Sequence, residues 1–159
     1  MTLLIKQRVF SFVDSYQVYN ETGEVRYEVE DALFRLGHNI HVYDKRTGRE
    51  VGSIHQKLFT FLPEFEIVID GQVRGSVRKE FTFFRPRYHV DYRGWTVEGD
   101  VFGWDYRVMR GDMEVMSISK ELLNWSDTYS LRYDSPADEI PGLLLVIAID
   151  AVNCDRNKN

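Results

Sequence analysis

Six basic side chains gather in the middle of the chain, and their chemistry suits a phosphorylated ligand. They are Arg74, Arg78, Lys79, Arg85, Arg87 and Arg93, offset within this stretch only by Glu80 and Asp91. An arginine binds phosphate oxygens through two parallel hydrogen bonds, so such a cluster could hold an anionic headgroup. Residues 100–139 are conversely acidic, with nine carboxylates against four bases. Two walls of opposite charge would orient the protein on an anionic surface. The alternative is a set of solvated side chains balanced across strands.

Other residues that carry out chemistry in proteins are present, but their spacing does not favour a reaction. His38 and His41 are three residues apart, which on a strand places them on opposite faces, where they cannot share a metal ion. Acidic pairs at two-residue spacing, Glu28 with Glu30 and Glu64 with Glu66, lie on one strand face. Paired acids need burial to catalyse proton transfer, and polar strand faces do not supply it. We predict no metal site.

The chain lacks the common catalytic and cofactor-binding motifs. No G-x-S-x-G elbow, glycine-rich phosphate loop or H-E-x-x-H segment occurs, and the single cysteine, Cys154, lies near the end of the chain. Trp95, Trp104 and Trp125 could stack on a ligand, but barrel interiors use tryptophan for packing as well. We therefore expect a non-enzymatic protein without catalytic residues or cofactors.

Alternating strands and tight turns fill most of the chain. Asp70-Gly71 and Arg93-Gly94 are turn signals, and runs such as 25–30 place apolar side chains on one face. This pattern predicts about twelve strands between residues 7 and 133. Residues 52–67 also align without gaps on residues 75–90, which indicates two related hairpin units. In each unit we expect the first strand to end at a phenylalanine, followed by a bend and a strand that opens on an aromatic residue.

The C-terminal segment Ile140–Val152 is apolar on all sides apart from Asp150, so it must be buried all round. About 14 residues of helix span only about 21 Å, which is too short to cross a bilayer. Twelve antiparallel strands close into a barrel that side chains alone cannot fill. The sequence therefore predicts an all-β, about twelve-stranded closed antiparallel barrel that encloses this helix. Ser135 and Pro136 could begin the helix, or Pro141 could mark its first turn.

Length and composition set the remaining bounds. The 159 residues, 14% of them aromatic, suit a single domain over 1–159 with a helix at about 136–153 and a polar tail at 154–159. A formal net charge of −5 argues against nucleic-acid binding. The first eight residues do not form a signal peptide, so we expect a cytoplasmic protein.

The chain resembles the LURP-one-related proteins of the tubby C-terminal-like superfamily. The resemblance covers nearly the whole chain. It rests on the opening Asp14–Tyr19, the turn through Gly23 into Val25–Val29, the Gly-Ser-Ile/Val hairpins and the apolar C-terminal helix. It implies a twelve-stranded barrel around a hydrophobic helix, as in tubby domains and phospholipid scramblases. It also implies action at membranes or phosphoinositide binding, although the basic phosphoinositide-contacting positions of tubby proteins have no match here.

Three functional hypotheses follow from these observations. The first is a regulatory barrel that binds anionic lipid headgroups or another phosphorylated ligand through the basic wall, peripherally at a membrane. The second is a protein–protein scaffold, which an exposed apolar patch of several hundred Å² would favour. The third is a small-molecule carrier or unrecognised enzyme, which needs a pocket of roughly 300 Å³ or more beside the helix. The oligomeric state is not predicted.

Overall fold

The computed structural model describes residues 1–6, 15–32, 37–80, 82–84, 87–121 and 128–154. Twelve strands precede one helix, and each strand is three to nine residues from the next. The strands are β1 Thr2–Lys6, β2 Ser15–Asn20, β3 Val25–Asp31, β4 Asn39–Asp44, β5 Glu50–Gln56, β6 Glu64–Ile69, β7 Gln72–Glu80, β8 Arg87–Asp91, β9 Trp95–Asp100, β10 Asp105–Arg110, β11 Met113–Glu121 and β12 Thr128–Tyr133.

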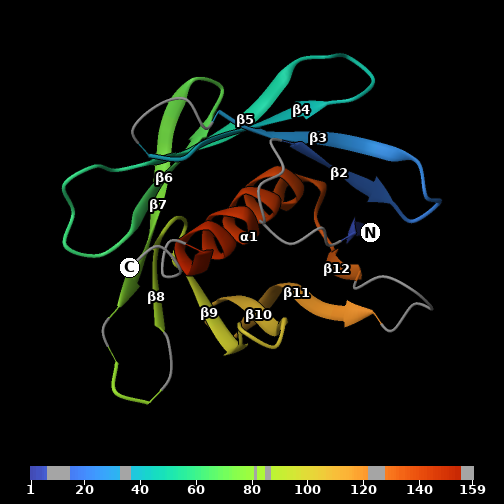
Figure 1. The fold of residues 1–159 in the computed structure, drawn as a ribbon. Helices are drawn as coiled ribbons and strands as arrows, with labels where there is room; N and C mark the ends of the chain where they lie inside the picture. The colour runs from blue at the N-terminus through green and yellow to red at the C-terminus, as the bar shows by residue number, and fades with distance from the viewer. Residues whose placement is uncertain (7–14, 33–36, 81, 85–86, 122–127, 155–159) are drawn as a thin grey trace.

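All twelve strands form one antiparallel sheet that curves around the helix (Figure 1). Chain neighbours pair with each other, and β1 pairs with β12, so the order runs β8 to β1 and then β12 to β9. Within the described residues no ladder joins β8 to β9, which follow each other through a turn at 92–94. The predicted twelve-stranded antiparallel barrel is confirmed in a nearly closed form, in which β8 and β9 are joined by this turn.

The turn signals in the sequence mark real reversals of the chain. Asp70 and Gly71 have φ angles of 53° and 70°, and Arg93 and Gly94 have φ angles of 48° and 68°. Two consecutive residues with positive φ match the right-handed twist of the flanking strands, which is why Asp-Gly suits such a hairpin. These two turns bring β6–β7 and β8–β9 back at the same end of the barrel.

A short 3-10 turn, η1 Pro136–Asp138, leads into α1 Glu139–Cys154. The Ser135 hydroxyl accepts a hydrogen bond from the backbone N–H of Ala137, and Pro136 occupies the first turn of η1. The α-helix proper starts only at Glu139, which places Pro141 in its first turn. The predicted start at Ser135 and Pro136 therefore corresponds to η1, and the alternative start at Pro141 corresponds to the first turn of α1. The proline needs no backbone donor there, because the first helical N–H groups have no intrahelical partner.

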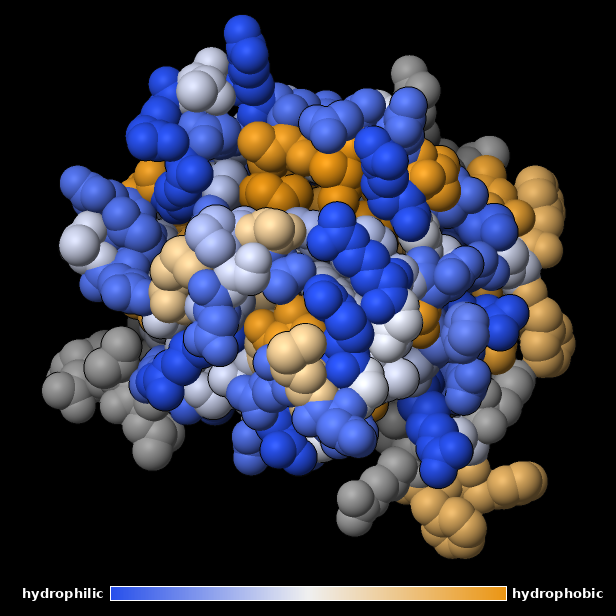
Figure 2. Space-filling model, turned by 180° about the vertical axis from the view of Figure 1, so that it is seen from behind, coloured by the Kyte–Doolittle hydropathy of each residue, from blue (hydrophilic) through white to orange (hydrophobic). Residues whose placement is uncertain are grey.

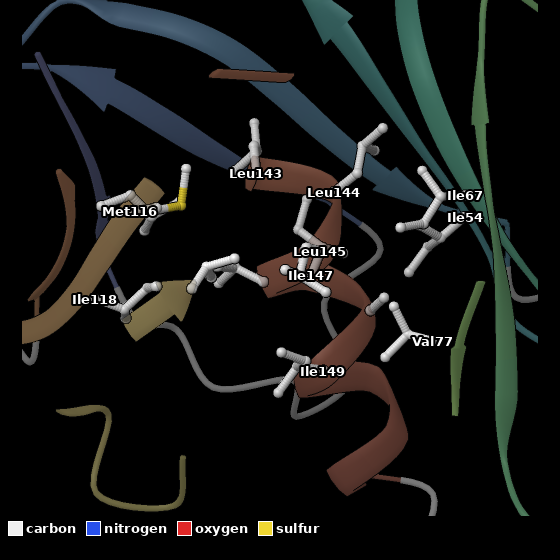
Figure 3. Packing of buried hydrophobic residues seen from close by; sticks show 14 of the residues in the cluster. Ile54, Ile67, Val77, Met116, Ile118, Leu143, Leu144, Leu145, Ile147 and Ile149 are labelled. Atoms are coloured by element: carbon white, nitrogen blue, oxygen red, sulfur yellow. The ribbon is translucent and has the colours of Figure 1, made fainter. Parts of the chain in front are cut away.

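The helix lies inside the sheet and supplies the centre of the core (Figure 3). Leu143, Leu144 and Leu145 are all fully buried, and Figure 3 shows Ile54, Ile67 and Val77 on one side of α1 with Met116 and Ile118 on the other. The predicted all-round burial of this segment is confirmed. At Gly52 of β5 a Cβ would lie 2.6 Å from Leu144 Cδ1, so a glycine lets the helix approach the strand closely.

Candidate binding sites at the two ends of the barrel

The barrel has two unlike ends. Antiparallel strands in chain order place alternate connections at the same end. We call one end the aromatic end; it carries the connections 57–63, 81–86 and 101–104 and the last turn of α1. We call the other the helix-start end; it carries the turns 70–71, 92–94 and 111–112 together with η1.

The structure splits the predicted basic cluster between these two ends. Arg74 and Arg93 lie at the helix-start end, where both line one surface cleft. Arg78 and Arg87 lie toward the aromatic end with their side chains exposed. Arg74 and Arg78 are thus about 13 Å apart along β7, at roughly 3.3 Å per residue. Arg85 falls outside the described residues, so its place in the cluster stays a prediction.

Lys79 points differently from Arg78, because successive strand residues face opposite sides of a sheet. Its Nζ atom donates a hydrogen bond of 3.3 Å to Oδ1 of Asn153 on α1 and lies 5.2 Å from the centre of the Phe102 ring. Lys79 therefore belongs to the mouth of the barrel rather than to its outer wall. Among the described members, Lys79 thus leaves the outer wall, whereas Arg74, Arg78 and Arg87 are exposed on the adjacent strands β7 and β8.

The cleft at the helix-start end has a volume of about 480 Å³. Its lining includes Arg74, Arg93, Tyr92 and Asp70 as well as Pro136 and Ile140. Arg93 also lies 3.9 Å from the largely buried Asp138 carboxylate, and Arg110 lies 3.6 Å from it. Two of the local arginines thus already neutralise an internal acid. With Asp70 at the rim as well, the cleft has little positive charge left for a phosphorylated ligand.

The first turn of α1 is held by a polar contact of its own. The Glu139 carboxylate accepts hydrogen bonds from the hydroxyls of Tyr27 on β3 and Tyr133 on β12, and Arg26 Nε lies 3.6 Å away. Burial, followed by the bond to Glu139, raises the pKa of both tyrosines. Both hydroxyls therefore stay protonated and donate to the carboxylate. This cluster ties the helix to two strands that are far apart in the sequence, which is a structural role.

The aromatic end presents fully exposed phenylalanines on its loops. The exposed fractions are 104% for Phe59, 91% for Phe61, 101% for Phe83 and 98% for Phe84. In Figure 2 hydrophobic groups project at the right edge and at the lower right, and further orange patches lie between hydrophilic side chains on the facing surface. Leu58 and Phe102, on the connections at the same end, are about half exposed. Contact with water is unfavourable for such groups, and their concentration makes this end a candidate interaction surface.

A small pocket opens at the aromatic end beside the last turns of α1. Its volume is about 70 Å³, and its lining is Val101, Phe102, Trp104, Tyr106, Ile149, Asp150 and Asn153. The β9–β10 connection shapes it, because Gly103 N–H bonds Asp100 Oδ1 at 3.0 Å and Trp104 N–H bonds the Val101 carbonyl at 3.3 Å. Trp104 is held at a φ of 55°, a conformation that non-glycine residues rarely adopt. Burial raises the pKa of Asp150 to about 7.

The remaining sequence candidates take part in local pairs. His38 Nδ1 lies 2.7 Å from Asp31, and His41 Nδ1 lies 3.2 Å from Glu50. Glu28 forms an ion pair with Lys45 at 2.8 Å, and Glu64 forms one with Lys57 at 3.1 Å. The described residues contain no group of His, Cys, Asp or Glu side chains arranged to hold a metal ion. Glu28 and Glu64 are thus balanced by neighbouring lysines.

The tryptophans differ in their surroundings. Trp95 is buried in the core, as expected. Trp104 stacks on Tyr129 at 3.8 Å between ring centres and also lines the small pocket, so it combines packing with access to a ligand. Trp125 falls outside the described residues.

Sequence reasoning missed both features of the aromatic end. We expected the first strand of each repeat to end at its phenylalanine, but β5 ends at Gln56 and β7 at Glu80. Phe59, Phe61, Phe83 and Phe84 therefore lie beyond the strands, where no sheet face covers them. The signal was present in the two aligned Phe-Thr-Phe segments next to Pro63 and Pro86, since proline disfavours continuation of a ladder. The Asp150 pocket depends on a fold-level juxtaposition of β9–β10 with α1 and has no local signal.

No helix in the described part of the chain is long and apolar enough to span a membrane. Among known proteins, the chain is 32% identical over 150 residues to the uncharacterized protein YxjI of Bacillus subtilis (strain 168), covering 94% of this chain and 92% of that protein. An X-ray structure of a protein from Arabidopsis thaliana shares the fold with a TM-score of 0.65 at 15% identity, over 96% of this chain and 90% of that one. The profile of the LURP-one-related family matches residues 1–150, and the chain belongs to this family.

Proposed function

We propose that this protein is a peripheral binding domain that docks its aromatic end on membranes containing anionic lipid. The observation that carries the proposal is the set of exposed phenylalanines at the tips of the β5–β6 and β7–β8 connections, at one end of a rigid barrel. Phe59, Phe83 and Phe84 each expose essentially their whole side chain. Full burial of one such side chain contributes about 1.5–3 kcal/mol, so two or three of them suffice for reversible binding.

The geometry of these side chains suits a lipid surface. They sit on separate loops rather than on one flat face, so together they can enter the soft boundary between headgroups and acyl chains without a matching protein surface. A protein partner would need a pocket for each ring in the same spatial arrangement. The protein–protein scaffold remains the alternative, and the experiment below separates the two.

Charge supports the same orientation. The β7–β8 hairpin that carries Phe83 and Phe84 also carries Arg78 and Arg87, both exposed. Each basic residue near an anionic membrane contributes about 1 kcal/mol. The chain as a whole has a formal net charge of −5, which a negative surface repels. Binding through the basic hairpin end keeps the acidic remainder of the molecule away from the lipid.

Co-sedimentation with vesicles tests the proposal. We expect the protein to pellet with vesicles of phosphatidylcholine plus phosphatidylserine and to pellet much less with phosphatidylcholine alone. The double variant Phe83→Ser/Phe84→Ser should weaken binding by about tenfold or more, because two inserted rings are lost. Arg78→Glu/Arg87→Glu should abolish the preference for the anionic vesicles. The matched control is Val73→Ser/Met113→Ser, which removes two exposed apolar side chains at the helix-start end.

Equal pelleting with both vesicle types, or unchanged binding of the phenylalanine double variant, would contradict the proposal. If the phenylalanine double variant binds vesicles as well as the unmodified protein but loses binding to a defined protein partner, the scaffold is favoured instead. The helix-start cleft gives a further comparison. If Arg74→Glu loses vesicle binding while the phenylalanine variant keeps it, the docking surface lies at the helix-start end instead.

A further inference from the structure

We propose that the pocket beside the last turns of α1 binds a primary ammonium group, with the Asp150 carboxylate as its counter-ion. The ammonium could belong to a free amine or to the headgroup of an aminophospholipid, which share this chemistry. The site needs no membrane, so it stands independently of the docking proposed above. Its evidence is the size of the pocket, the charge that faces it and the rings that surround it.

The size of the pocket selects a small ligand group. The pocket holds about 70 Å³, and a water molecule occupies about 30 Å³ in the liquid. Room for about two waters suits an ammonium group with one adjoining carbon. A drug-sized molecule needs several hundred Å³ and does not fit. The carrier hypothesis requires roughly 300 Å³ or more beside the helix, a volume that the helix-start cleft has and this pocket does not.

The carboxylate that faces the pocket has no compensating charge among the described residues. Asp150 is largely buried, and none of the described residues makes an ion pair or a side-chain hydrogen bond with its carboxylate. Burying an unpaired carboxylate is costly, and proteins rarely retain one without a partner. The last turn of α1 itself contains no basic residue, and the negative end of the helix dipole adds to the field that attracts a cation. Both fields attract a cation to the same place.

Aromatic rings complete the site. Phe102 and Tyr106 line the pocket with Trp104, and a cation near the face of such rings is attracted by their quadrupoles. The rim already draws one ammonium group, because Lys79 Nζ lies 5.2 Å from the Phe102 ring centre and 3.3 Å from Asn153 Oδ1. The backbone of Trp104 is held in an uncommon conformation, and such strained residues cluster at functional sites.

The groups around Asp150 predict how binding depends on pH. Tyr16 on β2 and Tyr106 on β10 face the carboxylate, and burial raises the pKa of both, so both remain neutral phenols. Asp31 lies near Tyr16, and Lys79 and the Tyr88 hydroxyl contact Asn153 one turn further on. Asp150 is thus the group that titrates near neutrality, because burial raises its pKa to about 7. Amine binding should be strong at pH 8 and weaken at pH 6, where the carboxyl is protonated.

Nuclear magnetic resonance on the full chain tests the inference. Titration of the ¹⁵N-labelled protein with methylammonium and ethanolamine at pH 8 should shift the Trp104 indole N–H signal, assigned with Trp104→Phe, in a saturable way. A lost charge-assisted contact weakens binding by roughly tenfold to a hundredfold, which is the effect we expect from Asp150→Asn. The matched control, Asp105→Asn, removes an exposed carboxylate near the same connection and should leave binding unchanged. Tetramethylammonium should bind more weakly than methylammonium because it is too large.

The source of the ammonium is distinguished by vesicles. Asp150-dependent retention on vesicles with ethanolamine headgroups, but not on vesicles with choline headgroups only, assigns the site to a lipid. Binding of soluble ethanolamine without such retention assigns it to a free amine. The inference is wrong if neither soluble amine produces a saturable shift at pH 8, or if folded Asp150→Asn binds as the unmodified chain does. Thermal unfolding followed by circular dichroism establishes that each variant is folded.

Discussion

At the scale of single residues, Asp150 is the side chain least explained by stability. It interrupts an otherwise apolar helix. In the structure it lies against a small pocket with no compensating cation from the described residues. A carboxylate kept in such a place at a cost to folding indicates a role beyond packing.

This cost gives the first residue-scale prediction. The pKa of Asp150 rises from 3.8 in the unfolded chain to about 7 in the folded protein. The folded state therefore binds the proton more tightly, so this contribution to stability is complete below about pH 4 and is lost as the pH rises through about 7. Asp150→Asn should become more stable than the unmodified protein by a few kcal/mol at most at pH 8 and by little at pH 4. Urea unfolding at both pH values measures the difference, and a difference independent of pH would contradict the assignment.

Glu139 is the opposite case, an acid whose partners are all present. Replacing it with alanine leaves the hydroxyls of Tyr27 and Tyr133 without their acceptor. Each buried donor left unpaired costs about 1–3 kcal/mol, so Glu139→Ala should be clearly destabilised in urea unfolding. Glu139→Gln should lose less, because its amide oxygen still accepts. Glu24→Ala, at an exposed turn, is the control, and equal effects of the two alanine substitutions would disprove the role of the Glu139 cluster.

At the scale of elements, the sequence predicted what local chemistry determines. Asp70-Gly71 and Arg93-Gly94 each require positive φ at both residues, so their turns were predictable. The apolar C-terminal segment could only be an internal helix. The ends of β5 and β7 were missed because phenylalanine is typical of strands, and that preference outweighed the nearby prolines, which disfavour continuation of a ladder. The sequence also did not show that Arg74 and Arg78 lie toward opposite ends of the barrel, because that separation depends on where β7 begins and ends.

The aligned glycines of the two repeats give an element-scale prediction. At Gly75 a Cβ would lie 2.1 Å from the backbone oxygen of Asp91, whereas at Gly52 the nearest atom is the Leu144 Cδ1 at 2.6 Å. A side chain can rotate away, but a paired backbone cannot. Gly75→Ala should therefore destabilise the protein by about 1–3 kcal/mol, and Gly52→Ala by less. Thermal unfolding of both variants measures this order, and a larger loss for Gly52→Ala would contradict it.

At the scale of the whole molecule, one helix serves as the core for twelve strands. The sheet is joined from β8 to β9 through a turn, and its inner face packs around α1. Because the helix fills the interior, binding chemistry is displaced to the loops and to the two ends. The amine pocket and the exposed phenylalanines lie on different connections of the same end, where α1 terminates, so a bound ligand and a docked surface would be close neighbours.

The dependence of the whole barrel on α1 is itself testable. Leu145 is fully buried in the middle of the helix, so Leu145→Asp places an unpaired charge in the centre of the core. No other element can replace the helix, and we expect a loss of more than about 4 kcal/mol, which unfolds the entire domain rather than one hairpin. Circular dichroism should lose the strand signal together with the helix signal. The control is Leu58→Asp, where the side chain is 45% exposed and the fold should persist. A folded, merely more soluble Leu145→Asp protein would show that the strands hold together without the helix.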